Sequence, residues 1–335
     1  MSTKKQSPEL RPLVSLSYLE YLLGTKRDRL QKIATSAGSY YQPFDIHKKG
    51  TDKWRHIDNP QHPLKTLQKR ILKNILNRNI RRLPDGMTGG ISGRSIVENA
   101  KIHIGKECIG VIDIKNCFPS TNYHQINQVW IDHFGCGYKT ANLLTKLTTF
   151  QHRLPQGAPT SPLLCNFALA PVFGEIKAVA DSAGLDITIF IDDITVSGSK
   201  KSITDSIEPI IKILVKHGYA VRKRKVKVIT SNYSQKVTGI PVNRKLSIGR
   251  GHIQQIRNLI LETASLKGYI PSNDYCKIQG KISFAKSVSK TQGVKLGKFA
   301  EKMLVHPLMQ VGVKKDEASR DCKRFSDNHK YTERN

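Results

Sequence analysis

Two adjacent aspartates, Asp192 and Asp193, interrupt a run of β-branched and aromatic residues at positions 188–196. Such a composition favours β-strands, so the run predicts two strands joined by a sharp bend at the acidic pair. Unpaired charges in a buried strand cost free energy, and a cation must compensate for them. Because successive residues of an extended chain face opposite sides, both carboxylates reach one metal site only from a tight turn. A solvent-exposed hairpin turn is the alternative.

A third aspartate, Asp113, ends an apolar stretch that predicts another buried strand, residues 109–113. Three acids around one site repel one another unless metal is present, and two divalent ions roughly 3.5–4 Å apart suit such a cluster. Mg²⁺ prefers oxygen ligands and keeps several waters, which leaves positions for the phosphates of a substrate. The three aspartates therefore predict a site for two Mg²⁺ ions that carries out phosphoryl transfer.

The chain is strongly basic, with 55 lysines and arginines against 26 aspartates and glutamates and a formal charge of +29. A polyanion is the expected partner. An anionic membrane is the alternative, but no stretch combines sufficient apolar length with freedom from helix breakers to span a bilayer. The longest uncharged run, residues 154–174, contains four prolines and predicts a loop followed by a buried helix. We therefore expect no membrane partner.

The cysteines and the first residues predict the location of the protein in the cell. Met1 is not followed by an apolar signal segment, and the six cysteines form no Cys-x-x-Cys pair. Both observations favour reduced thiols and a cytoplasmic protein.

Basic side chains are concentrated in two predicted elements of the N-terminal third. Residues 63–82 predict one amphipathic helix with lysines and arginines on its polar face. Residues 44–58 predict a hairpin around a Gly-Thr-Asp turn, with four cations, Lys48, Lys49, Lys53 and Arg55. Cations on such a hairpin suit a triphosphate, although a solvated basic hairpin is equally compatible with the pattern.

Loops rich in glycine and proline separate the predicted elements. Residues 88–95 form a glycine-rich loop that lacks the Gly-Lys-Ser/Thr ending of a P-loop, so we set aside a nucleotide-hydrolysing motor. A helix over residues 96–104 follows, with Asn99 and His103 one turn apart, a spacing that usually gives only a local hydrogen bond. Residues 154–162 form a second such loop before an apolar helix.

The C-terminal half alternates predicted helices with basic strands. Residues 203–217 predict a helix, residues 217–230 a strongly basic strand pair, and residues 237–248 a second strand pair. Residues 253–266 and 278–304 are helical and basic in pattern and predict a separate helical unit.

The order of these motifs resembles that of reverse transcriptases, and the similarity covers most of the chain. Residues 113–118, Asp-Ile-Lys-Asn-Cys-Phe, resemble the first catalytic carboxylate motif. Residues 154–162 resemble the loop that contacts nucleotide and template, and Phe-Ile-Asp-Asp at 190–193 resembles the Tyr-x-Asp-Asp box. Within this class, Asn-Ala-Lys-Ile-His at 99–103 and Val-Thr-Gly at 237–239 are similar to two signatures of retron reverse transcriptases.

The resemblance implies an α+β right-hand polymerase with fingers, palm and thumb. The palm would contain an antiparallel sheet and helices, and the thumb would be helical. The implied boundaries are an N-terminal helix in residues 1–24, fingers in 25–108 with part of 124–160, a palm in 109–244, and a thumb with a polar C-terminal tail in 245–335.

The resemblance also implies a role for individual residues. Asp113 and Asp192 would bind both Mg²⁺ ions, with Asp193 assisting and the Ile114 carbonyl nearby. Lys48 and Arg55 would hold the triphosphate of the incoming dNTP. Three further residues would contact the nucleotide: Gln156 at its sugar, Phe118 as a steric gate against a 2′-hydroxyl, and Lys225 as a proton donor to pyrophosphate. The retron signatures would bind RNA through Asn99, His103, Val237, Thr238 and Gly239.

Three positions depart from the family pattern. Phe190 replaces the usual tyrosine and Ile191 the usual alanine, which removes a hydroxyl near the primer end and adds bulk. Arg222 stands where an asparagine is common, which makes the alignment of Lys225 less secure.

The implied function is RNA-directed DNA synthesis of retron type. The enzyme would fold around its own structured noncoding RNA, start DNA from a 2′-hydroxyl of an internal guanosine and leave branched RNA-linked DNA (msDNA). An effector protein would act with it in anti-phage defence. Two alternatives remain at this point: a different reverse transcriptase, defence-linked or intron-derived, and a noncatalytic RNA-binding scaffold.

Overall fold

The computed structural model describes residues 12–47, 50–265 and 272–310. It divides into two compact units, with the boundary after Thr238. The sequence places the end of the palm nearby, at residue 244. The assignment of finger, palm and thumb boundaries stays a prediction, and each unit is described below by itself.

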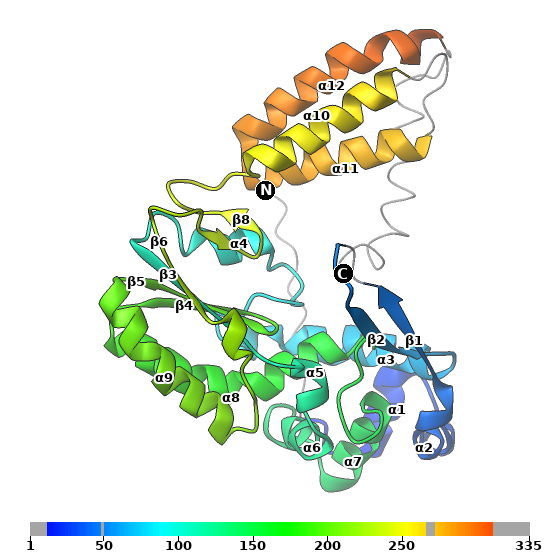
Figure 1. The fold of residues 1–335 in the computed structure, drawn as a ribbon. Helices are drawn as coiled ribbons and strands as arrows, with labels where there is room; N and C mark the ends of the chain where they lie inside the picture. Colours follow the sequence, from blue (N-terminus) through cyan, green and yellow to red (C-terminus); the bar gives the residue numbers. More distant parts are fainter. Residues whose placement is uncertain (1–11, 48–49, 266–271, 311–335) are drawn as a thin grey trace. The chain divides into compact units, whose positions relative to one another are not determined.

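A four-stranded antiparallel sheet forms the centre of the first unit (Figure 1). Its strands are β3 (Cys108–Asp113), β4 (Asp186–Phe190), β5 (Asp193–Gly198) and β6 (Lys227–Thr230), in the order β4-β5-β3-β6. The strand pair predicted around the two aspartates is confirmed, because β4 and β5 pair as an antiparallel hairpin. The mixed architecture with an antiparallel sheet confirms the expected fold class.

Two long helices, α8 (Ser161–Ser182) and α9 (Lys200–Lys216), cover one face of this sheet (Figure 1). Gly110 of β3 permits the close approach of α9, since a Cβ there would lie 2.7 Å from the Ile203 side chain. Among the described residues α8 alone has the length and composition of a membrane span, and 61% of its most apolar window is buried in the protein. This helix corresponds to the buried helix predicted from the uncharged run.

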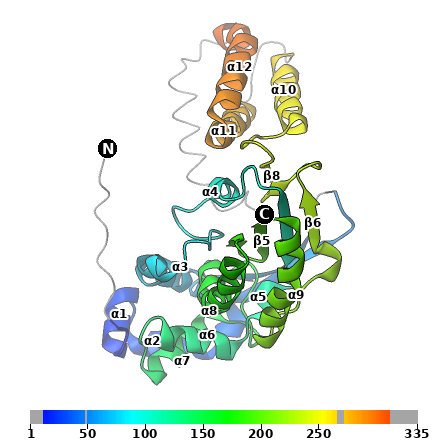
Figure 2. The same ribbon diagram turned by 90° about the vertical axis from the view of Figure 1, so that its left-hand side faces the viewer.

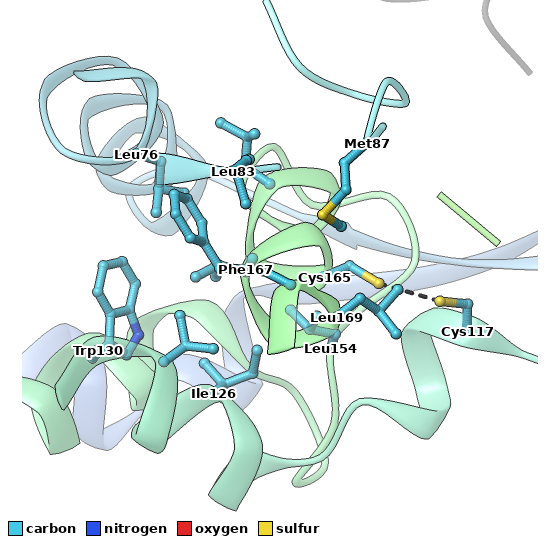
Figure 3. Packing of buried hydrophobic residues seen from close by; sticks show 14 of the residues in the cluster. Leu76, Leu83, Met87, Cys117, Ile126, Trp130, Leu154, Cys165, Phe167 and Leu169 are labelled. Atoms are coloured by element: carbon cyan, nitrogen blue, oxygen red, sulfur yellow. Dashed lines mark hydrogen bonds between the residues drawn. The ribbon is translucent and has the colours of Figure 1, made fainter. Parts of the chain in front are cut away.

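A second group of helices extends the same core. It comprises α1 (Leu16–Leu23), α2 (Arg27–Thr35), α3 (Leu64–Asn74), α6 (Tyr123–Asp132) and α7 (Tyr138–Thr148). Figures 1 and 2 both show α1, α2 and α7 lying together. Figure 3 shows part of the shared core, where Phe167 of α8 lies among Trp130, Leu76 and Leu83.

The helix predicted over residues 63–82 is interrupted. α3 ends at Asn74, and a 3-10 segment, η2 (Leu76–Arg82), follows it. Asparagine side chains compete for backbone groups at this point: Asn79 donates to the Ile75 carbonyl and Asn74 to that of Leu22. Such side-chain bonds favour a turn over a continuous helix.

Short elements complete the first unit. The basic hairpin is confirmed as β1 (Tyr41–His47) and β2 (Trp54–Pro60), preceded by η1 (Ala37–Tyr40). The helix α4 (Ile96–Lys101) begins with a capping box of Ser95 and Glu98 and is shorter than predicted. A single turn, α5 (Cys117–Ser120), follows β3.

The basic strand pair predicted at 217–230 is wrong in its first half. Only β6 is a strand there, and it follows a 3-10 turn, η3 (Lys223–Lys225). The amide of Arg222 donates to the Asp113 carbonyl, and the amide of Lys225 donates to the Arg222 carbonyl, so the chain bends around the end of β3. The strands predicted at 237–248 shrink to two residues each, β7 (Lys236–Val237) and β8 (Ile240–Pro241).

The second unit contains three helices, α10 (Arg250–Ala264), α11 (Ser272–Val288) and α12 (Lys290–Gln310). The single helix predicted over 278–304 is wrong, because the chain breaks at Ser289 and α12 packs back on α11. Gly293 permits this close packing, since a Cβ there would lie 2.4 Å from the backbone nitrogen of Lys286.

The thiols differ between the two units. Cys108, Cys117, Cys136 and Cys165 are free and buried, as expected, whereas Cys276 of α11 is disulfide-bonded, contrary to that expectation. The Cys117 and Cys165 sulfurs lie 3.2 Å apart in a hydrogen bond that joins α5 to α8 (Figure 3).

Candidate active site

The strand register brings the three predicted carboxylates to one end of the sheet. Asp113, the last residue of β3, pairs directly with Asp193, the first residue of β5. The amide of Ile114 donates a 2.8 Å hydrogen bond to the carbonyl of Asp192, which holds the end of β3 against the turn. Residues 78 and 80 positions apart in the sequence are therefore neighbours through backbone pairing.

The turn between β4 and β5 has two residues, Ile191 and Asp192, because Phe190 pairs with Asp193. This is the tight turn that the adjacent aspartates predict. Ile191 has a φ of 59°, a conformation that a β-branched residue rarely adopts. Gly89 packs against it, and a Cβ at position 89 would lie 2.6 Å from the Ile191 nitrogen.

The carboxylates affect one another electrostatically. Burial and the charges of Asp192 and Asp113 raise the pKa of Asp193 to about 6. Burial, followed by the Asp113 charge, also raises the pKa of Asp192. Lys225 and Arg222 oppose both shifts. The three acids are thus close enough to repel, and a cation bound among them would relieve this repulsion.

Two cations approach Asp113, whose side chain is almost fully buried. Its Oδ1 lies 2.7 Å from the Lys225 ammonium and 3.3 Å from the Arg222 guanidinium. Neither contact has the geometry of a hydrogen bond, and Oδ2 has no hydrogen-bond partner. Buried carboxylate oxygens without donors are suited to a hard divalent ion, so the donor set fits Mg²⁺.

The acids are not arranged as a complete ion cage. Within residues 12–47, 50–265 and 272–310, no three His, Cys, Asp or Glu side chains stand ready to hold one ion. The Lys225 ammonium occupies the position next to Asp113 Oδ1 that a metal ion would take, because the two groups form an ion pair.

The predicted nucleotide contacts lie on three different elements of the first unit. Phe118 is half-buried on α5, directly after the end of β3, and packs against the core. Arg55 is on β2 and Gln156 is in the loop before α8. Lys48 lies outside the described residues. These positions leave the nucleotide roles of Arg55, Phe118 and Gln156 as predictions.

A buried carboxylate that the motifs did not reveal joins two of these elements. Asp58 of β2 is fully buried. Its Oδ2 accepts hydrogen bonds from the Arg153 guanidinium at 3.2 Å and from the backbone amide of Gln156 at 3.1 Å. The Asp58 amide donates in turn to the Gln156 carbonyl at 2.8 Å. The hairpin bearing Arg55 is thereby fixed to the loop bearing Gln156.

Asn99 and His103 are both buried, and their RNA-binding role stays a prediction. Asn99 is 1% exposed, and its side-chain oxygen accepts from Thr88 at 2.9 Å. His103 is completely buried, with its two ring nitrogens beside Ser197 and Thr188. Asn99 lies on α4 and meets Thr88, whereas His103 lies in the turn after α4 and meets β4 and β5.

The three residues of the second retron signature, Val237 to Gly239, differ in solvent exposure. Val237 is 1% exposed, and its RNA-binding role also stays a prediction. Thr238, half-buried with a φ of 47°, donates its hydroxyl to the Ile96 carbonyl at 3.2 Å. Gly239 is exposed. RNA binding by Thr238 and Gly239 stays a prediction.

The chain matches a known protein family over most of the first unit. The family model described as "Reverse transcriptase (RNA-dependent DNA polymerase)" matches residues 46–242. The Retron Ec86 reverse transcriptase of Escherichia coli is 30% identical over 279 residues, which cover 82% of this chain and 85% of that protein. The Retron Mx65 reverse transcriptase of Myxococcus xanthus is 26% identical over 280 residues, which cover 77% of this chain and 64% of that protein.

Solved structures resemble the fold at much lower sequence identity. The apo telomerase from Candida tropicalis matches with a TM-score of 0.53 and 9% identity, over 88% of this chain and 65% of that chain. At this identity the similarity shows the fold alone.

Proposed function

The chain belongs to the retron-type reverse transcriptases and is an RNA-directed DNA polymerase, and from this we propose that it copies its own structured noncoding RNA into branched, RNA-linked single-stranded DNA. One observation carries the chemical part of this proposal. The pairing of Asp113 with Asp193 gathers three acids at the end of a sheet, beside the half-exposed bend of Asp192.

The three carboxylates would hold two Mg²⁺ ions. Asp113, Asp192 and Asp193 supply oxygen ligands, and the carbonyl of Ile114 adjoins them. The partnerless Oδ2 of Asp113 and the raised pKa values of Asp192 and Asp193 support this assignment. When bound, such ions lower the pKa of the attacking hydroxyl and neutralise charge on the triphosphate.

The surrounding cations would act on the leaving group. Lys225 is more than half exposed and lies at the acid cluster, so its ammonium is available to a triphosphate placed there. We propose that it donates a proton to pyrophosphate. Arg55 and Lys48 would bind the triphosphate from the hairpin, and Asp58 would hold the Gln156 loop at a fixed distance from that hairpin.

Selection for deoxynucleotides would depend on Phe118. Its ring follows the strand of Asp113 by five positions, so it adjoins the site at which the sugar of a nucleotide would bind. A bulky ring beneath the sugar excludes a 2′-hydroxyl by overlap. Gln156 would lie against the same sugar.

The partners and the biological role follow from family membership. The positive charge of +29 supports a large nucleic-acid partner, and the exposed Thr238–Gly239 turn and the second unit would contact it. DNA synthesis would begin at a 2′-hydroxyl of an internal guanosine of that RNA. We further propose that the protein is cytoplasmic, acts with an effector protein and has a role in anti-phage defence.

A single assay tests the chemistry. Purified protein is mixed with a primed RNA template, dNTPs and Mg²⁺, and Asp192→Asn is compared with the wild type. We expect extension by the wild type alone. Equal inactivity of both proteins on several primed templates would instead favour a noncatalytic scaffold. Sequencing of the nucleic acid that copurifies from the native host tests the second part, because msDNA contains a 2′–5′ branch.

A further inference from the structure

His103 bridges the two strands of the hairpin that carries the acidic turn. Its Nδ1 lies 2.7 Å from the Ser197 hydroxyl on β5, and its Nε2 lies 2.8 Å from the Thr188 hydroxyl on β4. A neutral imidazole has one donor and one acceptor nitrogen, and a hydroxyl can serve either, so both contacts are satisfied together. The ring therefore ties β4 to β5 in addition to their backbone ladder.

The side of the sheet on which His103 lies is the side of the acids. Residues that pair directly, or that differ by two along a strand, share a face. Ser197, Thr195 and Asp193 therefore face one way along β5, and Asp113 faces the same way opposite Asp193. Val196 faces the opposite side, where α9 packs. The His103 contacts thus brace the face from which Asp193 projects.

Asn99, one turn earlier on α4, braces a neighbouring segment. Its side-chain oxygen accepts from the Thr88 hydroxyl, and the Thr88 amide donates to the Ile189 carbonyl at 2.9 Å. The Ile189 amide donates to the Gly86 carbonyl at 2.8 Å, so residues 86–88 lie beside β4 and form an isolated parallel bridge between Met87 and Ile189.

The same segment ends against the turn itself. Gly89 contacts the backbone of Phe190 and Ile191, and its carbonyl accepts from the Asn166 side chain of α8 at 2.7 Å. The turn lies between a segment fixed by Asn99 and Asn166 and a strand pair fixed by His103. This arrangement holds Ile191 in its left-handed conformation, which is costly for a β-branched residue.

Buried polar side chains of this kind define geometry. Apolar residues of similar volume would fill the same space, but they would tolerate small shifts of one strand past another. A hydrogen-bonded side chain does not, because each shift leaves a buried donor or acceptor unpaired. His103 has both ring nitrogens paired, whereas Asn99 and Asn166 each pair one side-chain atom and leave the other, Asn99 Nδ2 and Asn166 Oδ1, buried without a hydrogen-bond partner.

We propose that Asn99 and His103 are positioning residues, which set the placement of the Asp192–Asp193 turn by hydrogen bonds to the strands and the segment around it. In this view the first retron signature serves the polymerase centre and does not read RNA. The proposal rests on the catalytic role proposed above for Asp192 and Asp193.

The test uses the full chain and a generic template, poly(rA) primed with oligo(dT), which contains no structured RNA. We expect His103→Ala to lower kcat for dTTP incorporation by about 10- to 100-fold, because small displacements of reacting groups have effects of this size. The KM for dTTP and the amount of copurifying RNA should remain near those of the wild type. His103→Gln, which keeps one donor and one acceptor, should recover much of the lost rate.

Two milder variants keep the test decisive if His103→Ala does not fold. Thr188→Val and Ser197→Ala each remove one hydrogen bond and leave the ring in place. Each should lower kcat by more than its effect on the melting temperature would account for. The double variant Thr188→Val with His103→Gln should lose less kcat than the two single variants predict when their effects are multiplied. Unchanged kcat in both single variants would overturn the proposal.

Other outcomes separate this proposal from its alternatives. Normal extension of the generic template by His103→Ala, together with loss of copurifying RNA, would show that the motif reads RNA. Asp192→Asn, measured in the same assay, tests the proposed function separately. Full activity of Asp192→Asn would overturn the role of the turn itself, whatever the His103 variants do.

Discussion

Asp113 and Asp193 are directly paired residues of adjacent antiparallel strands, at the point where β3 ends and β5 begins. Their separation is therefore set by the backbone ladder and does not depend on a flexible loop. The third acid, Asp192, is bound to the same point by the hydrogen bond from the Ile114 amide. An acid cluster built in this way has little freedom to relax when it is charged, which makes it dependent on cations.

This dependence gives a prediction for metal binding. We expect Mg²⁺ to raise the melting temperature of the wild type, by about 4 °C at ten times the dissociation constant. Asp192→Asn should lose most of this increase, since it removes one ligand and part of the repulsion. Differential scanning fluorimetry over a Mg²⁺ titration measures both proteins, and Asp205→Asn on the exposed side of α9 is the control. Equal shifts in all three would place the ion elsewhere.

Substitution of Phe118 should change sugar selectivity. Phe118→Ala is expected to incorporate ribonucleotides, and Phe118→Leu should be intermediate because it retains part of the bulk. Single-nucleotide incorporation with dNTP or rNTP gives the ratio of kcat/KM for each variant. A graded change in this ratio, with dNTP use largely retained, supports the gate. Unchanged selectivity in Phe118→Ala would show that another side chain meets the sugar.

Asp58 is expected to affect nucleotide binding without touching the nucleotide. Asp58→Asn weakens the contacts to Arg153 and keeps the shape, so we expect a loss of about 1–3 kcal/mol of stability and a raised KM for dNTP. Asp52→Asn, at an exposed position in the turn of the same hairpin, is the matched control, because Asp45 is linked to Asp58 through His56. Similar KM values for both variants would argue against coupling between the hairpin and the Gln156 loop.

The buried histidine gives a pH prediction. Burial lowers the pKa of His103 from 6.5 to about 4. As the pH falls from 6.5 to 4, the unfolded chain binds a proton that the folded chain does not, so the folded state loses stability over this range. The difference in free energy of unfolding between the wild type and His103→Gln should therefore be up to about 3 kcal/mol smaller at pH 4 than at pH 7.

Urea unfolding followed by tryptophan fluorescence measures this difference, since Trp130 is buried in the same unit. His124→Gln, at an exposed position on α6, is the control variant. A difference between wild type and His103→Gln that stays constant from pH 7 to pH 4.5 would show that the folded protein accepts the proton as readily as the unfolded chain.

The sequence was sufficient to predict the acidic turn and its partner strand. Alternating β-branched residues around Asp192 and Asp193 leave few other conformations, and an apolar strand ending at Asp113 can pair beside them. The local pattern could not reveal Asp58, because its partners Arg153 and Gln156 are 95 and 98 positions away, and the loop motif at 154–162 does not indicate which residue it pairs with. Only the packing of the hairpin on the loop brings them together.

The helix predicted over residues 96–104 was too long, because α4 ends at Lys101 and His103 lies in the turn after it. Periodicity alone does not say whether such polar residues meet solvent or protein. Here His103 meets β4 and β5, whose Thr188 and Ser197 hydroxyls supply its partners. In the basic run at 222–225, charge suggested a strand pair, whereas the nearby Asp113 carbonyl bends the chain into a 3-10 turn.

The contact between Gly89 and Ile191 bears on how related chains are judged. A methyl group at position 89 would overlap the backbone nitrogen of Ile191, so even alanine there would displace the bend that carries Asp192. Such a protein would retain every acid of the catalytic set and still be unable to copy RNA. Surveys that sort active from inactive homologues by their aspartates alone would count it among the active ones, and an uncharged position would have to be inspected as well.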